Sequence, residues 1–213
     1  MRKGNRSMTQ YPSNDQWNYS QSFISEDSNL IKARDKSKEL GLSAIGQGVG
    51  SLLKFLASTI DASNVVEIGT GTGVSGLWLF RGMNSAGVLT SIDSDQERQR
   101  AAKEIFSEAG IASNKIRLIA GRAIEVVAKL TDNAYDLMFI SGDKLEYETL
   151  LDQSLRLLRP GGILVFNNIL DDSNSADNEA VKAVSEKIKD DSRLVSVMLP
   201  SGSGIIASSY RPH

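Results

Sequence analysis

From residue 65 onward, short runs of β-branched and other apolar residues alternate with segments of helical periodicity. This alternation constrains the fold more than any other feature, because it is typical of a parallel sheet whose strands are connected by crossover helices. The predicted parallel strands are residues 65–68, 88–92, 116–119, 137–140 and 163–166. Their nearly continuous apolar character predicts that both faces of the sheet are buried.

The segments between these strands predict helices at residues 74–81, 95–109, 124–130, 146–158 and 178–189. Two further strands, 194–199 and 204–208, are separated by a turn that is too short for a parallel crossover, so we expect an antiparallel hairpin. Ahead of the sheet, residues 26–40 and 49–60 predict two helices that pack on its edge or over its top. The expected fold is therefore α/β, with seven strands and helices on both faces.

The chain of 213 residues is expected to form a single domain. We place that domain at residues 26–213, with N-terminal helices at 26–60 and the sheet core at 64–213, behind a polar arm at 1–25. The arm lacks the apolar stretch of a secretory signal, and no apolar run reaches the roughly 20 residues that a membrane-spanning helix needs. We therefore expect a cytoplasmic protein without a membrane partner.

The charge balance and two rare residue types narrow the chemistry. Lys and Arg number 24 against 26 Asp and Glu, a net charge of −2, which argues against a nucleic-acid partner. Cysteine is absent and the single histidine is His213, which excludes disulfides, thiolate nucleophiles and Cys/His zinc sites. The expected partner is a small molecule, and base catalysis would fall to Asp, Glu, Lys or Tyr.

A glycine-rich turn follows the first predicted strand, where open α/β sheets bind ligands. It reads Glu67-Ile68-Gly69-Thr70-Gly71-Thr72-Gly73-Val74-Ser75-Gly76. Such glycines let the backbone turn tightly and approach a ligand closely. Asp93 ends the second predicted strand, where its carboxylate can accept hydrogen bonds from two ribose hydroxyls. Together the turn and the acid predict a nucleoside site.

These two features alone leave the nucleoside open. The stretch from Gly71 to Gly76 satisfies the dinucleotide fingerprint, so a nicotinamide-dependent oxidoreductase remains an alternative. Glu67 favours another ligand, since an acid beside the glycines suits the positive charge of S-adenosylmethionine better than a pyrophosphate.

Five stretches in one order carry a closer resemblance. They are Val65-Val66-Glu67-Ile68-Gly69-Thr70-Gly71-Thr72-Gly73-Val74-Ser75, Thr90-Ser91-Ile92-Asp93, Ala120-Gly121-Arg122-Ala123, Tyr135-Asp136-Leu137-Met138-Phe139-Ile140-Ser141-Gly142-Asp143-Lys144 and Leu157-Leu158-Arg159-Pro160-Gly161-Gly162-Ile163-Leu164-Val165-Phe166-Asn167-Asn168. Over about residues 39–210 the chain resembles the class I S-adenosylmethionine-dependent O-methyltransferases of the catechol and caffeoyl-CoA type. The resemblance implies a Rossmann-like methyltransferase fold, S-adenosylmethionine as cofactor and a homodimer.

The resemblance also implies a cofactor site. In it, Ser75 binds the methionine carboxylate, Asp93 the ribose and Ala123 the adenine. The remaining positions that it implies at the methionine end and the turn are Ile45, Gly46, Glu67, Gly69, Thr70, Gly71 and Ser141.

The sequence departs from the family at the metal site. There a divalent metal is held by two aspartates and an asparagine, and Ser141, Asn167 and Asn168 occupy those positions here. Because hard divalent cations favour carboxylate oxygens, we expect that the metal has been lost, although Asp143 offers a nearby carboxylate. Lys144 matches the family's base, which would take the acceptor's proton.

The predicted function is methyl transfer from S-adenosylmethionine to a hydroxyl oxygen of a small, aromatic acceptor, without the divalent metal. The first alternative is a cofactor-binding protein that lost catalysis together with its metal. The oxidoreductase is the second.

Overall fold

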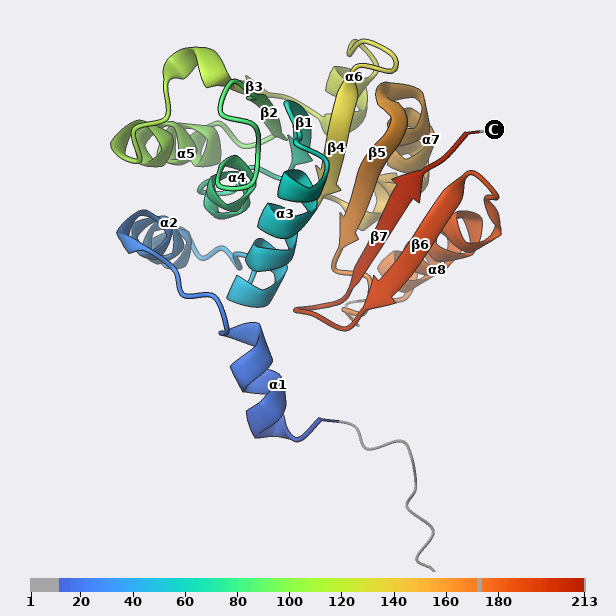
Figure 1. The fold of residues 1–213 in the computed structure, drawn as a ribbon, viewed down its shortest axis with the longest axis horizontal. Coiled ribbons are helices and arrows are strands. Elements are labelled where there is room, and N and C mark those ends of the chain that lie inside the picture. Colours follow the sequence, from blue (N-terminus) through green and yellow to red (C-terminus); the bar gives the residue numbers. More distant parts are fainter. Residues whose placement is uncertain (1–11, 172–173, 213) are drawn as a thin grey trace, which may run out of the picture.

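The computed structural model describes residues 12–171 and 174–212. Its sheet has seven strands in the order β3-β2-β1-β4-β5-β7-β6 (Figure 1). Their bounds are Asn64–Ile68 (β1), Val88–Asp93 (β2), Ile116–Ala120 (β3), Tyr135–Ile140 (β4), Leu158–Asn167 (β5), Leu194–Leu199 (β6) and Ile205–Tyr210 (β7). Strands β1 to β5 pair in parallel, whereas β7 is antiparallel to both β5 and β6. The predicted α/β sheet and its hairpin are confirmed.

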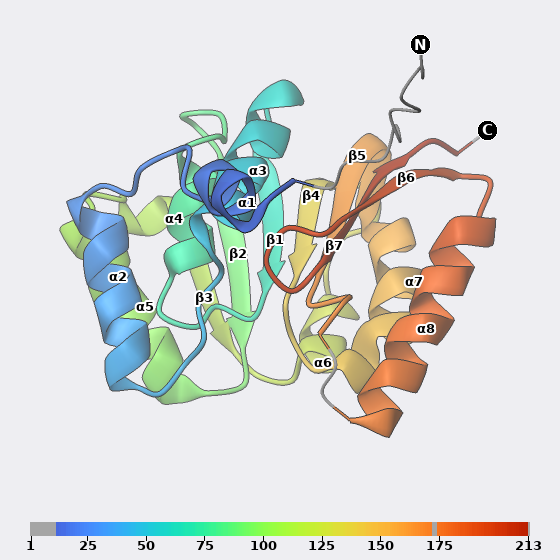
Figure 2. The same cartoon turned by 90° about the horizontal axis from the view of Figure 1, so that it is seen from below.

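Helices cover both faces of this sheet (Figure 2). On one face lie α3 (Gln47–Thr59), α4 (Val74–Phe80) and α5 (Gln96–Glu108), and on the other lie α6 (Ala123–Val127), α7 (Tyr147–Leu157) and α8 (Ser175–Asp190). Helix α2 (Ser28–Glu39) packs outside α4 and α5, and η1 (Ser113–Lys115) and η2 (Lys144–Glu146) are single 3₁₀ turns. The two helical layers bury β1, β2, β4 and most of β5 on both sides, as their apolar sequences predict, whereas β3 is only partly buried.

Helix α3 lies on a face of the sheet, so its predicted position on the edge or over the top is wrong. Val49, Leu53 and Ala57 recur at intervals of four residues and form one buried stripe against the strands. At Gly50 the helix touches α4 so closely that a Cβ would lie 2.3 Å from the Trp78 ring. This close approach brings the loop between α2 and α3 to the carboxyl ends of the strands.

The N-terminal arm contains a helix that the sequence analysis did not predict. Residues 1–11 of the arm lie outside the described part, but α1 (Asn14–Gln21) extends beyond the carboxyl ends of the parallel strands (Figure 1). A reciprocal capping box between Ser13 and Gln16 starts this helix. At its other end, the Ser201 hydroxyl donates to Gln21 Oε1 at 2.9 Å, which connects α1 to the β6–β7 turn.

The order of the strands creates a crevice between β1 and β4. From β1 the chain proceeds outward to β2 and β3, and from β4 it proceeds in the opposite direction. Ligands of open α/β sheets bind at such a switch point, outside the carboxyl ends. Gly69 lies at this edge with φ +91°, and a Cβ on it would lie 2.3 Å from the carbonyl oxygen of Ser141. The strand ends can approach this closely only because position 69 is glycine.

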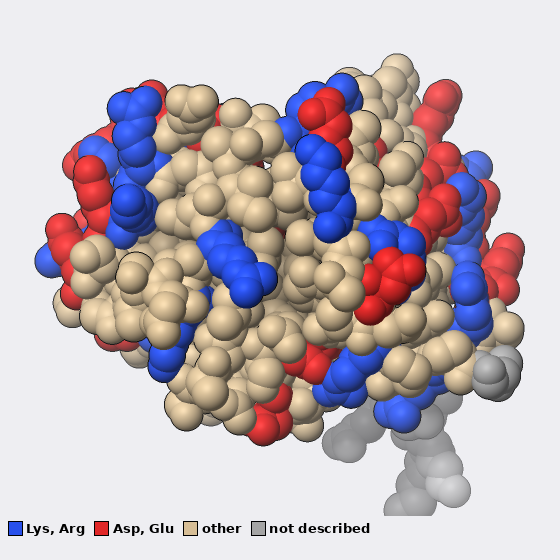
Figure 3. All heavy atoms as spheres, turned by 90° about the horizontal axis from the view of Figure 1, so that it is seen from above, with Lys and Arg blue, Asp and Glu red and all other residues tan. Residues whose placement is uncertain are grey.

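On the face where the parallel strands begin, basic and acidic side chains are interspersed with broad uncharged areas (Figure 3). This face carries no continuous basic stripe of the kind that follows a nucleic-acid backbone. Among the helices in residues 12–171 and 174–212, none combines the length and apolar character that crossing a bilayer requires.

Candidate active site

Two adjacent cavities open at the carboxyl ends of β1, β2 and β4. The larger cavity has a volume of about 480 Å³, within the range of roughly 300–1,000 Å³ that is usual for small-molecule sites, and the smaller one has about 130 Å³. Gly69, Asp93, Arg98 and Ser141 line both cavities. Since these residues are shared, the two cavities form the two ends of one cleft.

Eight of the ten predicted cofactor residues line this cleft. Ala123 lies in the larger cavity, and Gly69, Asp93 and Ser141 lie between the two; the smaller cavity adds Ile45, Thr70, Gly71 and Ser75. Gly46 lines neither cavity and instead caps the start of α3. Glu67 also lines neither, because its side chain is completely buried beneath the turn.

Glu67 ends a chain of buried hydrogen bonds. The Ser91 hydroxyl donates to Glu67 Oε2 at 2.5 Å and lies 2.7 Å from Thr70 Oγ1. Gln99 Nε2 donates to Thr70 Oγ1 at 3.0 Å. Because Ser91 donates to Glu67, the Thr70 hydroxyl must donate to Ser91, which gives the chain a single direction. These bonds connect the turn after β1 to β2 and α5.

Burial raises the pKa of Glu67 to about 7, against the lowering influence of the Ser75 and Ser91 hydroxyls, and the charge of Asp93 adds to the rise. Its second oxygen, Oε1, has no hydrogen-bond partner among residues 12–171 and 174–212. Glu67 thus places an incompletely satisfied acid directly behind the residues that line the smaller cavity.

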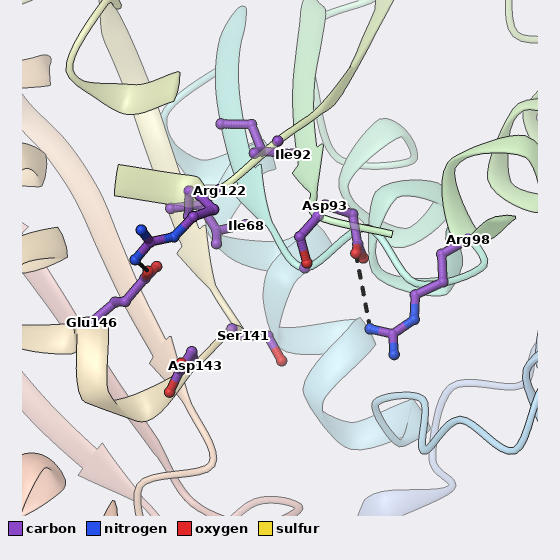
Figure 4. A pocket seen from close by; sticks show the side chains of 13 residues that line it. Ile68, Ile92, Asp93, Arg98, Arg122, Ser141, Asp143 and Glu146 are labelled. Carbon is purple, nitrogen blue, oxygen red and sulfur yellow. Dashed lines mark hydrogen bonds and ion pairs between the residues drawn. The ribbon is translucent and has the colours of Figure 1, made fainter. Parts of the chain in front are cut away.

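Asp93 is buried at the end of β2, and backbone amides hold both its oxygens. The N–H of Gly71 donates to Oδ2 and the N–H of Asp95 donates to Oδ1, each at 3.0 Å. Arg98 approaches Oδ1 at 3.9 Å from α5 (Figure 4). A carboxylate has about four lone-pair positions, so Asp93 retains acceptor capacity toward the cleft.

Several residues that the sequence analysis did not assign shape the site. Arg122 and Glu146 form an ion pair of 3.2 Å at the rim of the larger cavity (Figure 4), and Arg34 donates to the carbonyl oxygen of Ile45 at 2.8 Å. The role of Gln99 could have been predicted from its spacing in the sequence. Gln99 precedes Ala102 by three residues and Phe106 by seven, which makes it a polar residue on the buried stripe of α5.

The three family metal positions hold neutral groups that bond to one another. Asn167 Nδ2 donates to Ser141 Oγ at 3.1 Å, and Asn168 has the left-handed backbone angle φ +58°. In this arrangement Asn167 turns its N–H₂ donor toward Ser141, and neither side chain carries the negative charge that hard divalent cations favour, so the pair as arranged does not fit a divalent metal. Within residues 12–171 and 174–212, no three His, Cys, Asp or Glu side chains group closely enough to hold a metal ion.

Lys144 and Asp143 lie together after β4. Asp143 is exposed, lines the larger cavity and accepts a hydrogen bond from the N–H of Leu145 at 3.0 Å. Lys144 is only 7% exposed, and its Nζ contacts Asp171 Oδ2 at 3.1 Å and the Asp171 carbonyl oxygen at 3.2 Å. The predicted base therefore lies in an ion pair with the loop that follows β5.

Comparison with known proteins agrees with this geometry. The sequence matches the family model described as O-methyltransferase over residues 21–209. A curated relative from Mycobacterium sp. (strain JLS), whose name includes O-methyltransferase, is 42% identical over 198 residues, which cover 90% of this chain and 90% of the relative.

Two solved structures share the fold. A protein from Corynebacterium glutamicum superposes with a TM-score of 0.85 at 28% identity, over 92% of this chain and 96% of that chain. The O-methyltransferase TomG from Streptomyces achromogenes, involved in tomaymycin synthesis and solved in complex with SAM, superposes with a TM-score of 0.82 at 25% identity, over 92% of this chain and 95% of that chain.

Proposed function

Because this chain belongs to the O-methyltransferase family, we propose that it transfers a methyl group from S-adenosylmethionine to a hydroxyl oxygen of a small aromatic acceptor without a divalent metal. The observation that carries the proposal is the cleft itself. Its two cavities meet at Asp93 and Ser141, so that a nucleoside in one and an amino-acid moiety in the other would bring a sulfonium to their junction.

The adenosine would occupy the larger cavity, with Asp93 accepting from the ribose hydroxyls and Ala123 beside the adenine. The methionine moiety would occupy the smaller cavity, between Ser75, the turn after β1 and the loop at Ile45. When bound, the cofactor supplies a methyl group on a cationic sulfur. In its ionised form, the buried acid Glu67 favours such a cation through its negative charge, and no direct contact with the ligand is required.

Lys144 can act on the acceptor in two ways. A neutral amine would take the phenolic proton, whereas an ammonium would stabilise the phenolate that remains after the proton has left. The ion pair with Asp171, of 3.1 Å, holds the side chain between the loops after β4 and β5, where the acceptor would approach the cleft. Positioning of the acceptor oxygen against the methyl group would supply much of the remaining acceleration.

Calorimetric titration with S-adenosylhomocysteine and with NAD tests this assignment. We expect S-adenosylhomocysteine to bind and NAD to give no signal at the same concentrations. Tight binding of NAD without a response to S-adenosylhomocysteine would support the oxidoreductase alternative. If S-adenosylhomocysteine binds but no phenol is ever methylated, the protein is a cofactor-binding protein that has lost catalysis.

A further inference from the structure

The pair formed by Ser141 and Asn167 has a defined direction. Asn167 is 4% exposed, and its Nδ2 donates to Ser141 Oγ at 3.1 Å. The backbone of Ser141 is fixed as well, since its N–H donates to the carbonyl oxygen of Ile68 at 2.9 Å. Ser141 Oγ therefore accepts from behind, and its own hydrogen is left to point elsewhere.

Tyr147 holds Asn167 in place. Its buried hydroxyl donates to the backbone carbonyl oxygen of Asn167 at 2.9 Å. Burial raises the pKa of Tyr147, and the negative charges of Asp143, Asp177 and Asp171 add to the rise, so the phenol stays protonated and remains a donor. The buried Tyr147 and Asn167 thus support Ser141, which lines the cleft, from behind.

The Ser141 hydroxyl lies where it can donate a hydrogen bond to a ligand in the cleft. Ser141 lines both cavities, and Figure 4 shows its side chain at the edge of the larger one. Across residues 12–171 and 174–212, no protein acceptor takes the hydrogen of this hydroxyl. Because it lies at the junction where the methyl group would be, its natural acceptor is the oxygen that receives that group.

A hydroxyl donor and a divalent cation select different acceptors. A cation that binds both hydroxyls of a catechol requires two neighbouring oxygens, whereas a single O–H donor requires a lone pair on one oxygen. We propose that Ser141, oriented by Asn167, holds the acceptor oxygen by donating a hydrogen bond, and that the protein therefore accepts phenols with one hydroxyl group as readily as catechols. This proposal rests on the proposed function, because it assumes that the methyl donor occupies the cleft.

The test uses the full chain in complex with sinefungin, an S-adenosylmethionine analogue that carries an amine in place of the sulfonium methyl. The probes are 4-nitrophenolate and 4-nitrocatecholate, whose absorbance changes when a donor bonds to the oxygen. We expect the native complex to bind both probes with affinities within about 10-fold of each other. Neither affinity should change when EDTA replaces magnesium.

Substitutions of Ser141 and Asn167 test which side chain donates the hydrogen bond to the acceptor oxygen. Ser141→Ala should weaken both probes by about 10-fold or more, the usual loss for a hydrogen bond to a charged group, and Ser141→Thr should retain native affinity. Asn167→Asp should cause a similar loss, because the new carboxylate would take the Ser141 hydrogen. Ser196→Ala is the matched control, since it removes another serine hydrogen bond, of 2.8 Å to Ser208, far along the sheet.

The affinity for sinefungin, measured in every variant, distinguishes failure of the proposed function from failure of this inference alone. If the native protein does not bind sinefungin, the proposed function fails and the inference fails with it. If sinefungin binds but Ser141→Ala leaves both probes unaffected, only the inference is overturned. Binding of 4-nitrocatecholate that is over 100-fold tighter and requires magnesium would also overturn it, as would failure of 4-nitrophenolate to bind the native complex.

Discussion

The cleft formed by the two cavities, here called the cofactor end, and the group of Ser141, Asn167 and Lys144 beside it, here called the acceptor end, are built on different principles. At the cofactor end, the two acids are anchored to the backbone or to a hydroxyl, Asp93 by two amides and Glu67 by Ser91. At the acceptor end, a neutral pair of side chains occupies positions that the resemblance assigns to a metal, and the buried Lys144 forms an ion pair with the loop after β5. This contrast is what our proposal requires, in which the protein binds the cofactor as its relatives do and activates the acceptor by other means.

The largest expected effect is at the acceptor end. Lys144→Met keeps the bulk of the side chain and removes its charge and its proton, so we expect turnover on an identified phenol to fall by about 10² or more. The affinity for S-adenosylhomocysteine should stay near native, since Lys144 lines neither cavity. The measurement is steady-state turnover together with calorimetry.

Lys187→Met is the control for that change. Lys187 forms an ion pair of 2.9 Å with Glu148 on the outer helices, so its loss removes a similar contact away from the cleft. Native turnover in Lys144→Met would refute any role of this lysine in handling the acceptor.

The next effect is at the cofactor end. Asp93→Ala removes the acceptor for the ribose hydroxyls, and we expect S-adenosylhomocysteine to bind more weakly by about 1.5–3 kcal/mol. Asp95→Ala is the matched control, because Asp95 caps α5 and lines neither cavity. Equal losses in the two variants, measured calorimetrically, would show that Asp93 only stabilises the turn.

A third effect is on stability. The pKa of Glu67 is about 7 in the folded protein against an ordinary value of 4.5, so the folded state binds this proton more tightly. Stability should therefore fall as the pH rises from about 4.5 to 7 and become level above that. Between pH 5.5 and 8 the loss is about 2 kcal/mol, and Glu67→Gln should abolish it in urea unfolding.

The control for Glu67→Gln is Asp136→Asn, which changes another acid with a shifted pKa. The pKa of Asp136 is lowered, because hydrogen bonds from Asn64, Arg159 and Ser63 outweigh the opposing influence of burial. The contribution of Asp136 to the free energy of unfolding is lost only at acid pH, below the range of pH 5.5 to 8. Asp136→Asn should thus destabilise the protein equally at pH 5.5 and 8. A native stability that does not change over this window would show that Glu67 is ionised throughout.

The smallest effect concerns the metal. Combining Ser141→Asp with Asn167→Asp restores both carboxylates and should create magnesium affinity, which appears as about 1.4 kcal/mol of stabilisation at 10 times the dissociation constant. The native protein should show none. If magnesium stabilises the native chain to the same extent, the neutral pair of Ser141 and Asn167 does not prevent metal binding at the acceptor end.

The sequence predicts the cofactor end better than the acceptor end for a physical reason. The strands and the turn are encoded locally, by continuous apolar runs and by glycines at fixed spacing. Helix α1 was missed because it buries no residue and so lacks an apolar period, and α3 was misplaced because periodicity identifies a buried stripe but not its partner. The partner of Lys144 could not be predicted locally, because Asp171 is 27 residues away and on another loop.

The central claim is that the cleft transfers a methyl group without a metal ion. Its most direct test is a single-turnover assay in which chelator-treated native protein, loaded with methyl-labelled S-adenosylmethionine, is mixed with a panel of phenols and catechols. We expect labelled methyl ether to form at the same rate with EDTA as with magnesium. Product that forms only after magnesium is added would contradict the account.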